Sequence, residues 1–221
     1  MRILAASDLH GNLETYRWII GVAEDRNAEL IVLAGDLLGS GDNGDTIERA
    51  QRRDATRLVS ILGALFVPVF YIMGNDDWVE LTSPGERVRS LHRGRVDRDG
   101  FNFVGYQCTL PFMGGVNERS EEAIASELLP LESLMDERTI LVTHSPVAGV
   151  LDSTLLGQAG SVSIRDAIRR RGVRAHIHGH VHESFGRDGR HFNVAAGRQR
   201  RAMLIDLNSM IHEVLEGIAQ S

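Results

Sequence analysis

Residues 1–39, MRILAASDLHGNLETYRWIIGVAEDRNAELIVLAGDLLG, decide the fold class. Two apolar runs of strand length, RILAA (2–6) and LIVLA (30–34), lie on either side of an amphipathic stretch. From Leu13 onward this stretch places apolar side chains on one helical face: Tyr16, Ile19, Ile20 and Ala23. The order strand, helix, strand predicts a parallel pair of strands joined by a crossover helix.

The same alternation continues along the chain. Further apolar runs are VPVFYIM (67–73), TILVT (139–143) and VRAHI (173–177), and helical patterns cover 46–65, 120–136 and 161–171. A repeated β-α order predicts a largely parallel sheet with helices on its faces.

Hairpin signals interrupt this order twice. Asp99-Gly100 and Asp188-Gly189 each separate two strand-like segments, as a tight turn requires. The chain after residue 184 continues as strand after strand, so we expect a second, mostly antiparallel sheet packed with the first. No shift in composition marks a linker, and we expect a single domain over 1–221.

The composition limits the possible partners. Of the 221 residues, 43% are hydrophobic and 24% charged, as in ordinary globular proteins. The net charge of −6 has the wrong sign for binding a long polyanion, which argues against a nucleic-acid partner. No apolar run approaches the roughly 20 residues of a membrane span, and the opening run is too short for a signal peptide. We therefore expect a cytoplasmic protein with no membrane partner.

Five of the predicted strands are each followed by side chains that can bind a metal. In chain order they are Asp8 and His10, Asp36, Asn75 with Asp76 and Asp77, His144, and finally His180 with His182. The carboxyl ends of parallel strands share one edge of a sheet, where ligands bind between the loops. These side chains are therefore expected to form one site.

The mixture of donors indicates which metals fit. Carboxylate, amide and imidazole groups without a thiolate suit Mn²⁺, Fe or Zn²⁺ better than Ca²⁺ or an iron–sulfur cluster. Even without Asp76 and Asp77, the seven remaining candidates exceed the needs of one four-coordinate ion. They suffice for two ions about 3.5–4 Å apart that share a carboxylate and clamp a phosphoryl group. We expect two divalent transition-metal ions, foremost Mn²⁺, with Fe, Zn²⁺, Ni²⁺ and Co²⁺ as alternatives.

Five short motifs in order resemble the calcineurin-like metallophosphoesterases. That family shows D-x-H, G-D, G-N-H-[DE], a lone His and G-H-x-H, each at a strand end. The matching stretches are SDLHGN (7–12), AGDLL (34–38), MGNDDW (73–78), THSP (143–146) and GHVH (179–182). One such motif is weak evidence, whereas all five in order are specific.

The resemblance implies a fold, a metal site and a reaction. The fold is an α/β four-layer α/β/β/α sandwich of two mixed sheets flanked by helices. One ion is held by Asp8, His10, Asp36 and His182, and the other by the bridging Asp36 with Asn75, His144 and His180. A hydroxide shared by the two ions attacks phosphorus in a small phosphodiester or phosphomonoester. Asn12 and Asn75 are expected to contact the substrate.

The third motif departs from the family pattern. Asp76 stands where most members have a His that helps to protonate the leaving oxygen. A carboxyl group with an ordinary pKa near 3.9 is ionised at pH 7, so Asp76 is a poor substitute as the catalytic acid. This favours a diester over a monoester substrate. One alternative is a nuclease acting on DNA or RNA ends, which would need a basic groove. The other is a non-catalytic scaffold on the same fold, which would not need to keep the metal ligands.

The stretch RAHIHGHVH (174–182) places a histidine at every second position. Gly179 is expected to end the strand, so His180 and His182 are the ligands in the loop. His176 and His178 are expected to pack in or against the sheet. His178 is also a candidate for orienting a ligand from behind.

For three further features near the motifs, the sequence either argues against a function or leaves two interpretations open. GSGDNG (39–44) matches G-x-G-x-x-G, but Asp42 and Asp45 would repel a pyrophosphate, so we expect a loop at the rim of the site and no nucleotide cofactor. PFMGGVNE (111–118) is either a plain connection or a substrate-side loop, and Trp78 packs in the core or forms a wall of the substrate pocket.

Overall fold

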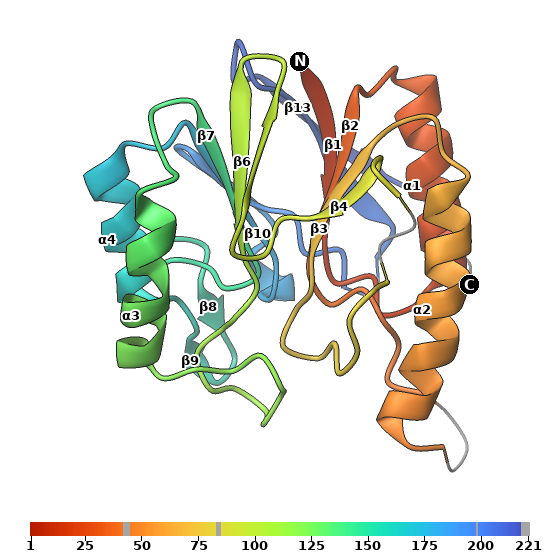
Figure 1. The fold of residues 1–221 in the computed structure, drawn as a ribbon, viewed down its shortest axis with the longest axis horizontal. Coiled ribbons are helices and arrows are strands. Elements are labelled where there is room, and N and C mark those ends of the chain that lie inside the picture. Colours follow the sequence, from red (N-terminus) through yellow and green to blue (C-terminus); the bar gives the residue numbers. More distant parts are fainter. Residues whose placement is uncertain (42–44, 83–84, 198, 218–221) are drawn as a thin grey trace.

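The computed structural model describes residues 1–41, 45–82, 85–197 and 199–217. Part of the expected rim loop, 42–44, thus lies outside the described residues. Figure 1 shows two sheets packed face to face with helices on their outer sides. The helices are α1 (Leu13–Asp25), α2 (Ile47–Gly63), α3 (Glu121–Glu132) and α4 (Val162–Arg171), with a short 3₁₀ turn at His182–Ser184. All four α-helices agree with the patterns read from the sequence.

The first sheet has a parallel centre. Its order is β14 (His212–Glu216), β13 (Arg201–Asp206), β1 (Arg2–Ala6), β2 (Leu30–Ala34), β3 (Val69–Ile72) and β4 (Val88–Ser90). Strands β1 to β4 run parallel, whereas β13 and β14 are antiparallel to their neighbours.

The second sheet follows the same plan. Its order is β11 (Gly186–Asp188), β12 (His191–Asn193), β10 (Ala175–His178), β7 (Thr139–Thr143), β6 (Phe101–Tyr106) and β5 (Arg95–Arg98). The four inner strands are parallel, and β5 and β11 close the edges as antiparallel hairpins at the two Asp-Gly turns. A small hairpin, β8 (Ser153–Thr154) and β9 (Gly157–Gln158), lies apart from both sheets.

Successive residues of the strands face different layers of the core. Leu4 packs with the residues of α1 and α2, whereas its neighbour Ile3 packs between the sheets. On the second sheet, Val142 faces the first sheet, and Leu141 faces α3 and α4. Both sheets are therefore buried on two sides, as the α/β/β/α sandwich requires.

The expectation of a mostly antiparallel second sheet is wrong. The strands after residue 184 divide between the two sheets, and only edge or near-edge pairings are antiparallel. Strand β13 shows why, because Leu204 packs in the outer layer and Met203 packs between the sheets. A strand buried on both faces fits beside β1 inside a sheet, whereas a separate half-exposed sheet would leave one face in water.

Polar caps set the start of each helix. Asn12, Thr46, Ser120 and Ser161 accept hydrogen bonds from backbone N–H groups in the first turns of α1 to α4. Such caps satisfy donors that have no partner inside the helix. Among the described residues, no helix combines the length and the hydrophobicity needed to cross a membrane.

Candidate metal centre

The loops after β1 and β2 are joined through their backbones. The N–H groups of Asp8, His10 and Gly11 donate to the carbonyls of Gly35, Asp36 and Leu37 at 2.9, 3.0 and 2.9 Å. The first two motifs therefore form one rigid platform at the carboxyl edge of the first sheet. The sequence pattern had predicted this meeting of neighbouring parallel strands.

Several candidate ligands have left-handed backbone conformations. The φ angles are 59° at Asp8, 43° at His10, 50° at Asp36 and 72° at His180. Such conformations are unfavourable for residues with a Cβ and concentrate at functional sites. The backbone strain at these positions indicates that the loops are shaped to direct the side chains.

Two motif glycines permit the close approach of the loops. A Cβ on Gly74 would lie 2.1 Å from Oδ1 of Asp36, and one on Gly179 would lie 2.4 Å from Oδ2 of Asp8. Real Cβ contacts are not this short. The glycine that begins the G-N and G-H-x-H patterns of the third and fifth motifs is thus required by the position of a carboxylate.

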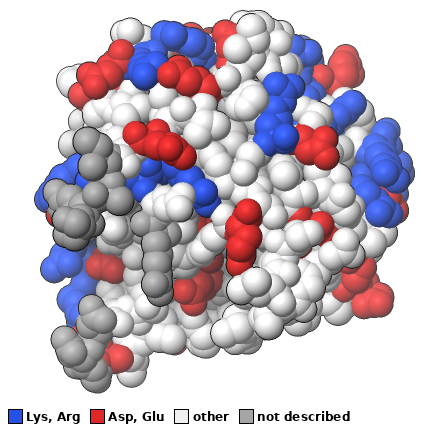
Figure 2. Space-filling view, turned by 180° about the vertical axis from the view of Figure 1, so that it is seen from behind, with Lys and Arg blue, Asp and Glu red and all other residues white. Residues whose placement is uncertain are grey.

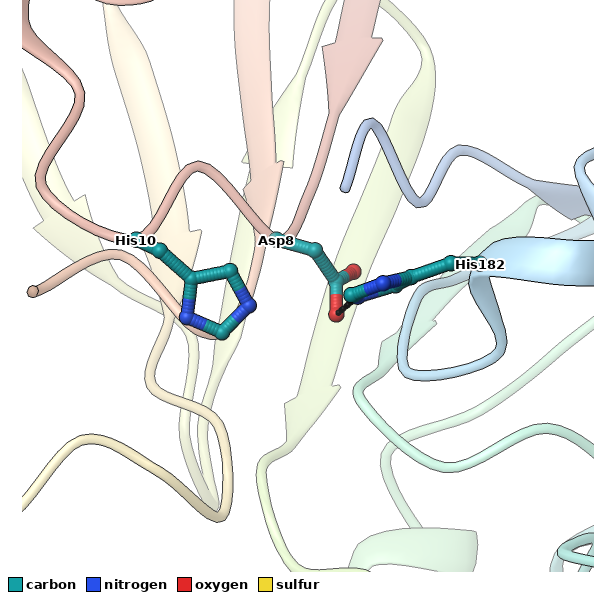
Figure 3. A group of neighbouring side chains, drawn as sticks. All are labelled: Asp8, His10 and His182. Atoms are coloured by element: carbon teal, nitrogen blue, oxygen red, sulfur yellow. Dashed lines mark hydrogen bonds and ion pairs between the residues drawn. The ribbon is translucent and has the colours of Figure 1, made fainter. Parts of the chain in front are cut away.

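One set of candidate ligands is reached by solvent through its two histidines. Asp8, His10 and His182 each offer an atom within 4.8 Å of the others, and we call them the open group. Figure 3 shows the two histidines on either side of Asp8. Nε2 of His182 lies 3.1 Å from Oδ1 of Asp8, and the two imidazole side chains are 42% and 35% exposed.

A second set is enclosed. Asp8, Asp36 and His144 also offer atoms within 4.8 Å of one another, and we call them the buried group. Nδ1 of His144 lies 2.8 Å from the carbonyl of Ala34, so the ring directs Nε2 toward Oδ2 of Asp36 at 3.2 Å. Asp8 belongs to both groups. The role of Asp36 as the bridging ligand stays a prediction.

The remaining two predicted ligands lie beside the buried group. His180 donates its backbone N–H to Oδ2 of Asp8 at 3.0 Å, and its ring centroid is 5.2 Å from that of His144. Asn75 is buried, and its Oδ1 has no hydrogen-bond partner among the described residues. Buried polar atoms normally have a partner. A metal ion fits this orphaned oxygen and the surrounding carboxylate and imidazole donors.

The pKa values of the site reflect a balance of burial and charge. Burial lowers the pKa of His144, but the carboxylates of Asp36 and Asp8 outweigh it and raise the pKa to about 10. Burial raises the pKa of Asp8 and Asp36, and the neighbouring histidines outweigh it, so both carboxyl groups have lowered values. The buried carboxylates are thus balanced by positive charge, which a divalent cation would also supply.

Asp76 lies at the open side of this arrangement. Its backbone N–H donates to Oδ1 of Asp36 at 2.9 Å, and its Oδ2 is 3.7 Å from Nδ1 of His10. The side chain is 40% exposed. Burial and the charge of Asp36 raise the pKa of Asp76 above its ordinary value, so this carboxyl group departs from the ordinary acid assumed from the sequence.

Asn12 has a structural role in the fold. Its Oδ1 accepts from the backbone N–H groups of Glu14 and Thr15 at 3.1 and 3.0 Å, which caps α1. Contact between Asn12 and a substrate stays a prediction.

Two residues support the site through hydrogen bonds to backbone groups, a role that was not assigned to either of them from the sequence. Asp77, in the loop after β3, accepts from the backbone N–H groups of Leu37, Leu38 and Gly74. Burial and the charge of Asp36 outweigh these hydrogen bonds and raise the pKa of Asp77 to about 8. The run of two aspartates after Asn75 was the available signal.

Gln51 is the second supporting residue, and it reaches the third motif from α2. Its side-chain amide donates to the carbonyl of Asp76 at 2.7 Å and accepts from the N–H of Trp78 at 2.6 Å. No local pattern in the sequence distinguishes this glutamine. The Trp78 side chain is exposed, so it does not pack in the core, and its place beside the substrate stays a prediction.

The four histidines of 174–182 divide as expected from Gly179. His176 and His178 belong to β10 and are fully buried. His176 lies 2.8 Å from the hydroxyl of Thr143 and 3.0 Å from Nδ1 of His191. Nδ1 of His178 faces the carbonyl of Gly179 at 3.2 Å, and its Nε2 has no partner among the described residues. Neither ring bonds to a predicted ligand side chain.

Comparison with solved structures supports the fold. The chain is similar to TT1561 of Thermus thermophilus, with 20% identity, 97% of this chain and 98% of that chain covered, and a TM-score of 0.72. A dimetal phosphatase from Danio rerio is 13% identical, with coverages of 92% and 95% and a TM-score of 0.63. An archaeal phosphodiesterase is 15% identical, with coverages of 98% and 100% and a TM-score of 0.56.

The sequence comparisons decide the family. No curated protein matches the chain. The family model described as calcineurin-like phosphoesterase matches residues 1–184, which include all five motifs and every predicted ligand. The chain therefore belongs to the calcineurin-like phosphoesterase family, whose members bind divalent metal ions.

Proposed function

We propose that this protein hydrolyses a small phosphate ester with the help of two divalent transition-metal ions, foremost Mn²⁺, and that it prefers diesters to monoesters. The observation that carries the proposal is that the open and buried groups meet at Asp8, with the predicted bridging ligand Asp36 in the buried group. Two cations held around a shared carboxylate can contact one phosphoryl group from both sides. Similar solved structures include a dimetal phosphatase and a phosphodiesterase.

The proposed function assigns different roles to the residues of the site. Asp8, His10, Asp36, Asn75, His144, His180 and His182 would hold the ions. When bound, the ions supply an activated water and offset the charge of the phosphoryl group. Asp76 lies beside His10 at the exposed side, where its carboxyl group can meet the leaving oxygen of a substrate.

The preference for diesters follows from charge. A monoester dianion carries more negative charge toward Asp76 than a diester monoanion does. Asp76 is also close to Asp36, because its own N–H donates to that carboxylate. Repulsion between like charges therefore acts more strongly against the monoester.

The distribution of charge supports a small substrate. The net charge is −6, and Figure 2 shows acidic and basic side chains interspersed on that face of the molecule, without one basic band. A nuclease needs a basic groove that follows the backbone of its substrate. A metal site can bind a small anion without such a groove.

One assay tests the proposal. Purified protein, stripped of metal and then loaded with Mn²⁺, Zn²⁺, Fe²⁺, Ni²⁺ or Co²⁺, is given bis-p-nitrophenyl phosphate or p-nitrophenyl phosphate. We expect metal-dependent turnover with the diester favoured. Asp36→Ala is expected to abolish it, and Asp76→His to raise the monoesterase activity. The absence of turnover with every metal and both substrates would favour a non-catalytic scaffold instead.

A further inference from the structure

A cavity of about 390 Å³ opens next to the metal centre. Its walls come from the segment around Phe112 and from the β8–β9 hairpin, and His180 lies in its lining. A cavity of about 150 Å³ is sufficient for a benzene ring. The space is therefore large enough for an aromatic ring or a short alkyl chain.

The lining of this cavity is mixed, with more apolar than polar surface. It includes Leu110, Pro111, Phe112, Leu156 and Ala159, with Thr154, Gln158 and His180 as polar members, and among the described residues no Arg, Asp or Glu lines it. Such a surface offers no counter-charge to a phosphate or a carboxylate. The free energy of the system falls when an apolar group replaces the water at this surface.

The hairpin and the facing segment expose large apolar side chains. Leu155 is 93% exposed, Leu156 is 79% exposed and Met113 is 77% exposed. Exposed apolar side chains gathered at the rim of a site mark a surface that binds an apolar partner. Nothing in the packing of the core requires these residues to be leucine or methionine.

The cavity and the metal centre share a wall. The ring centroid of Phe112 is 4.9 Å from that of His180, and the ring of His180 is 5.2 Å from that of His144 in the buried group. A phosphate held by the ligand groups would thus place one of its ester groups against Phe112. Pro111 and Phe112, in the segment 111–118 whose role the sequence left open, thus line the cavity beside His180.

We propose that this cavity binds an apolar alkyl or aryl group esterified to the substrate phosphate, so that the substrate is an amphiphilic phosphate ester and not a polar nucleotide or sugar. The proposal rests on the proposed function for the position of the phosphate. The cavity itself can be tested without turnover.

The first experiment compares p-nitrophenyl phosphodiesters that carry a methyl, ethyl, propyl or butyl group, with the Mn²⁺-loaded protein. Each buried methylene is expected to raise kcat/KM about fourfold, which corresponds to ~0.8 kcal/mol. Leu156→Ser is expected to lower the butyl-to-methyl ratio by fivefold or more. This ratio does not depend on the fraction of active protein. Leu129→Ser, the same change at an exposed position on α3, is the matched control and should keep the wild-type ratio.

The second experiment measures binding of butylphosphonate and methylphosphonate to the metal-loaded protein by calorimetry. Tighter binding of butylphosphonate, lost in Leu156→Ser, would support the cavity even if no ester were hydrolysed, and the proposed function alone would then fail. Equal binding of the two phosphonates, or an unchanged ratio in Leu156→Ser, would overturn the proposal. A wild-type dimer that Leu156→Ser converts to monomers would also overturn it, because a second copy would then cover the cavity.

Discussion

The open and buried groups of the candidate metal centre share Asp8 but differ in their surroundings. In the open group the imidazoles of His10 and His182 are 35% and 42% exposed. In the buried group the side chains of Asp36 and His144 are 7% and 0% exposed. The same kinds of donor therefore serve one half that water can reach and one half that is part of the protein interior.

This difference has an energetic meaning. Removal of one partner from a buried ion pair leaves an uncompensated charge and costs about 3–5 kcal/mol. Removal of an exposed partner costs about 0–1 kcal/mol. The buried group should thus contribute to folding as well as to metal binding, and the open group should contribute to metal binding alone.

Asp8→Ala is expected to have the largest effect, because it removes the side chain that both groups share. We expect kcat/KM to fall by about 10³-fold or more, since a bound metal is worth several kcal/mol to the transition state. Metal analysis of the purified variant should show loss of both ions. Asp25→Ala, at an exposed position at the end of α1, should keep the full metal content and activity. Retention of one ion by Asp8→Ala would show that the two groups bind independently.

His144→Ala and His10→Ala compare the two groups directly. In metal-free protein, His144→Ala leaves Asp36 buried without its imidazole partner, and we expect the free energy of unfolding to fall by about 3–5 kcal/mol. His10→Ala should change it by less than about 1 kcal/mol. Urea denaturation in the presence of a chelator measures both values. Equal losses in the two variants would mean that exposure does not distinguish the groups.

Much of the fold, and the meeting of several candidate ligands, could be predicted because the signals are local. The run RILAA, the periodicity from Leu13 and the two Asp-Gly turns each correspond to an observed element. The candidate ligands follow strand ends, so their meeting depends on the parallel order of the strands. How the strands after residue 184 divide between the two sheets depends on which faces of these strands become buried. The residues that bury them are far away in the sequence, so local patterns could not predict this division.

The residues that support the site were also hard to predict from the sequence, because they too act on distant partners. Gln51 and Asp77 act through backbone groups of loops that lie far away in the sequence, and backbone groups leave no residue pattern. The pKa of Asp76 likewise depends on burial and on Asp36 beside it. The sequence placed Asp76 in the correct motif, but its environment came from the packing.

Gln51→Met tests whether the geometry of the buried group depends on the two hydrogen bonds that Gln51 of α2 makes to the third motif. Methionine keeps the length of the side chain and the helix propensity, but the carbonyl of Asp76 and the N–H of Trp78 lose their partner. We expect the free energy of unfolding to fall by about 2 kcal/mol and kcat to fall by about tenfold, with little change in KM. Arg52→Met, at the neighbouring exposed position, should change neither. A KM effect without a kcat effect would assign Gln51 to substrate binding instead of positioning.

His178→Leu should have the smallest effect, although His178 is only two residues from a ligand. Its ring lies in β10, bonds only to the carbonyl of Gly179, and leaves Nε2 without a partner among the described residues. Leucine removes one hydrogen bond and one unsatisfied polar atom, so the two changes in stability oppose each other within about 1 kcal/mol. We expect metal affinity and kcat/KM to stay within twofold of wild type. His180→Leu, at the next alternate position, should lower both by 100-fold or more. A residue that orients a metal ligand typically costs about 10–100-fold when it is replaced, so a loss of that size in His178→Leu would place this histidine behind the buried group as a positioning residue.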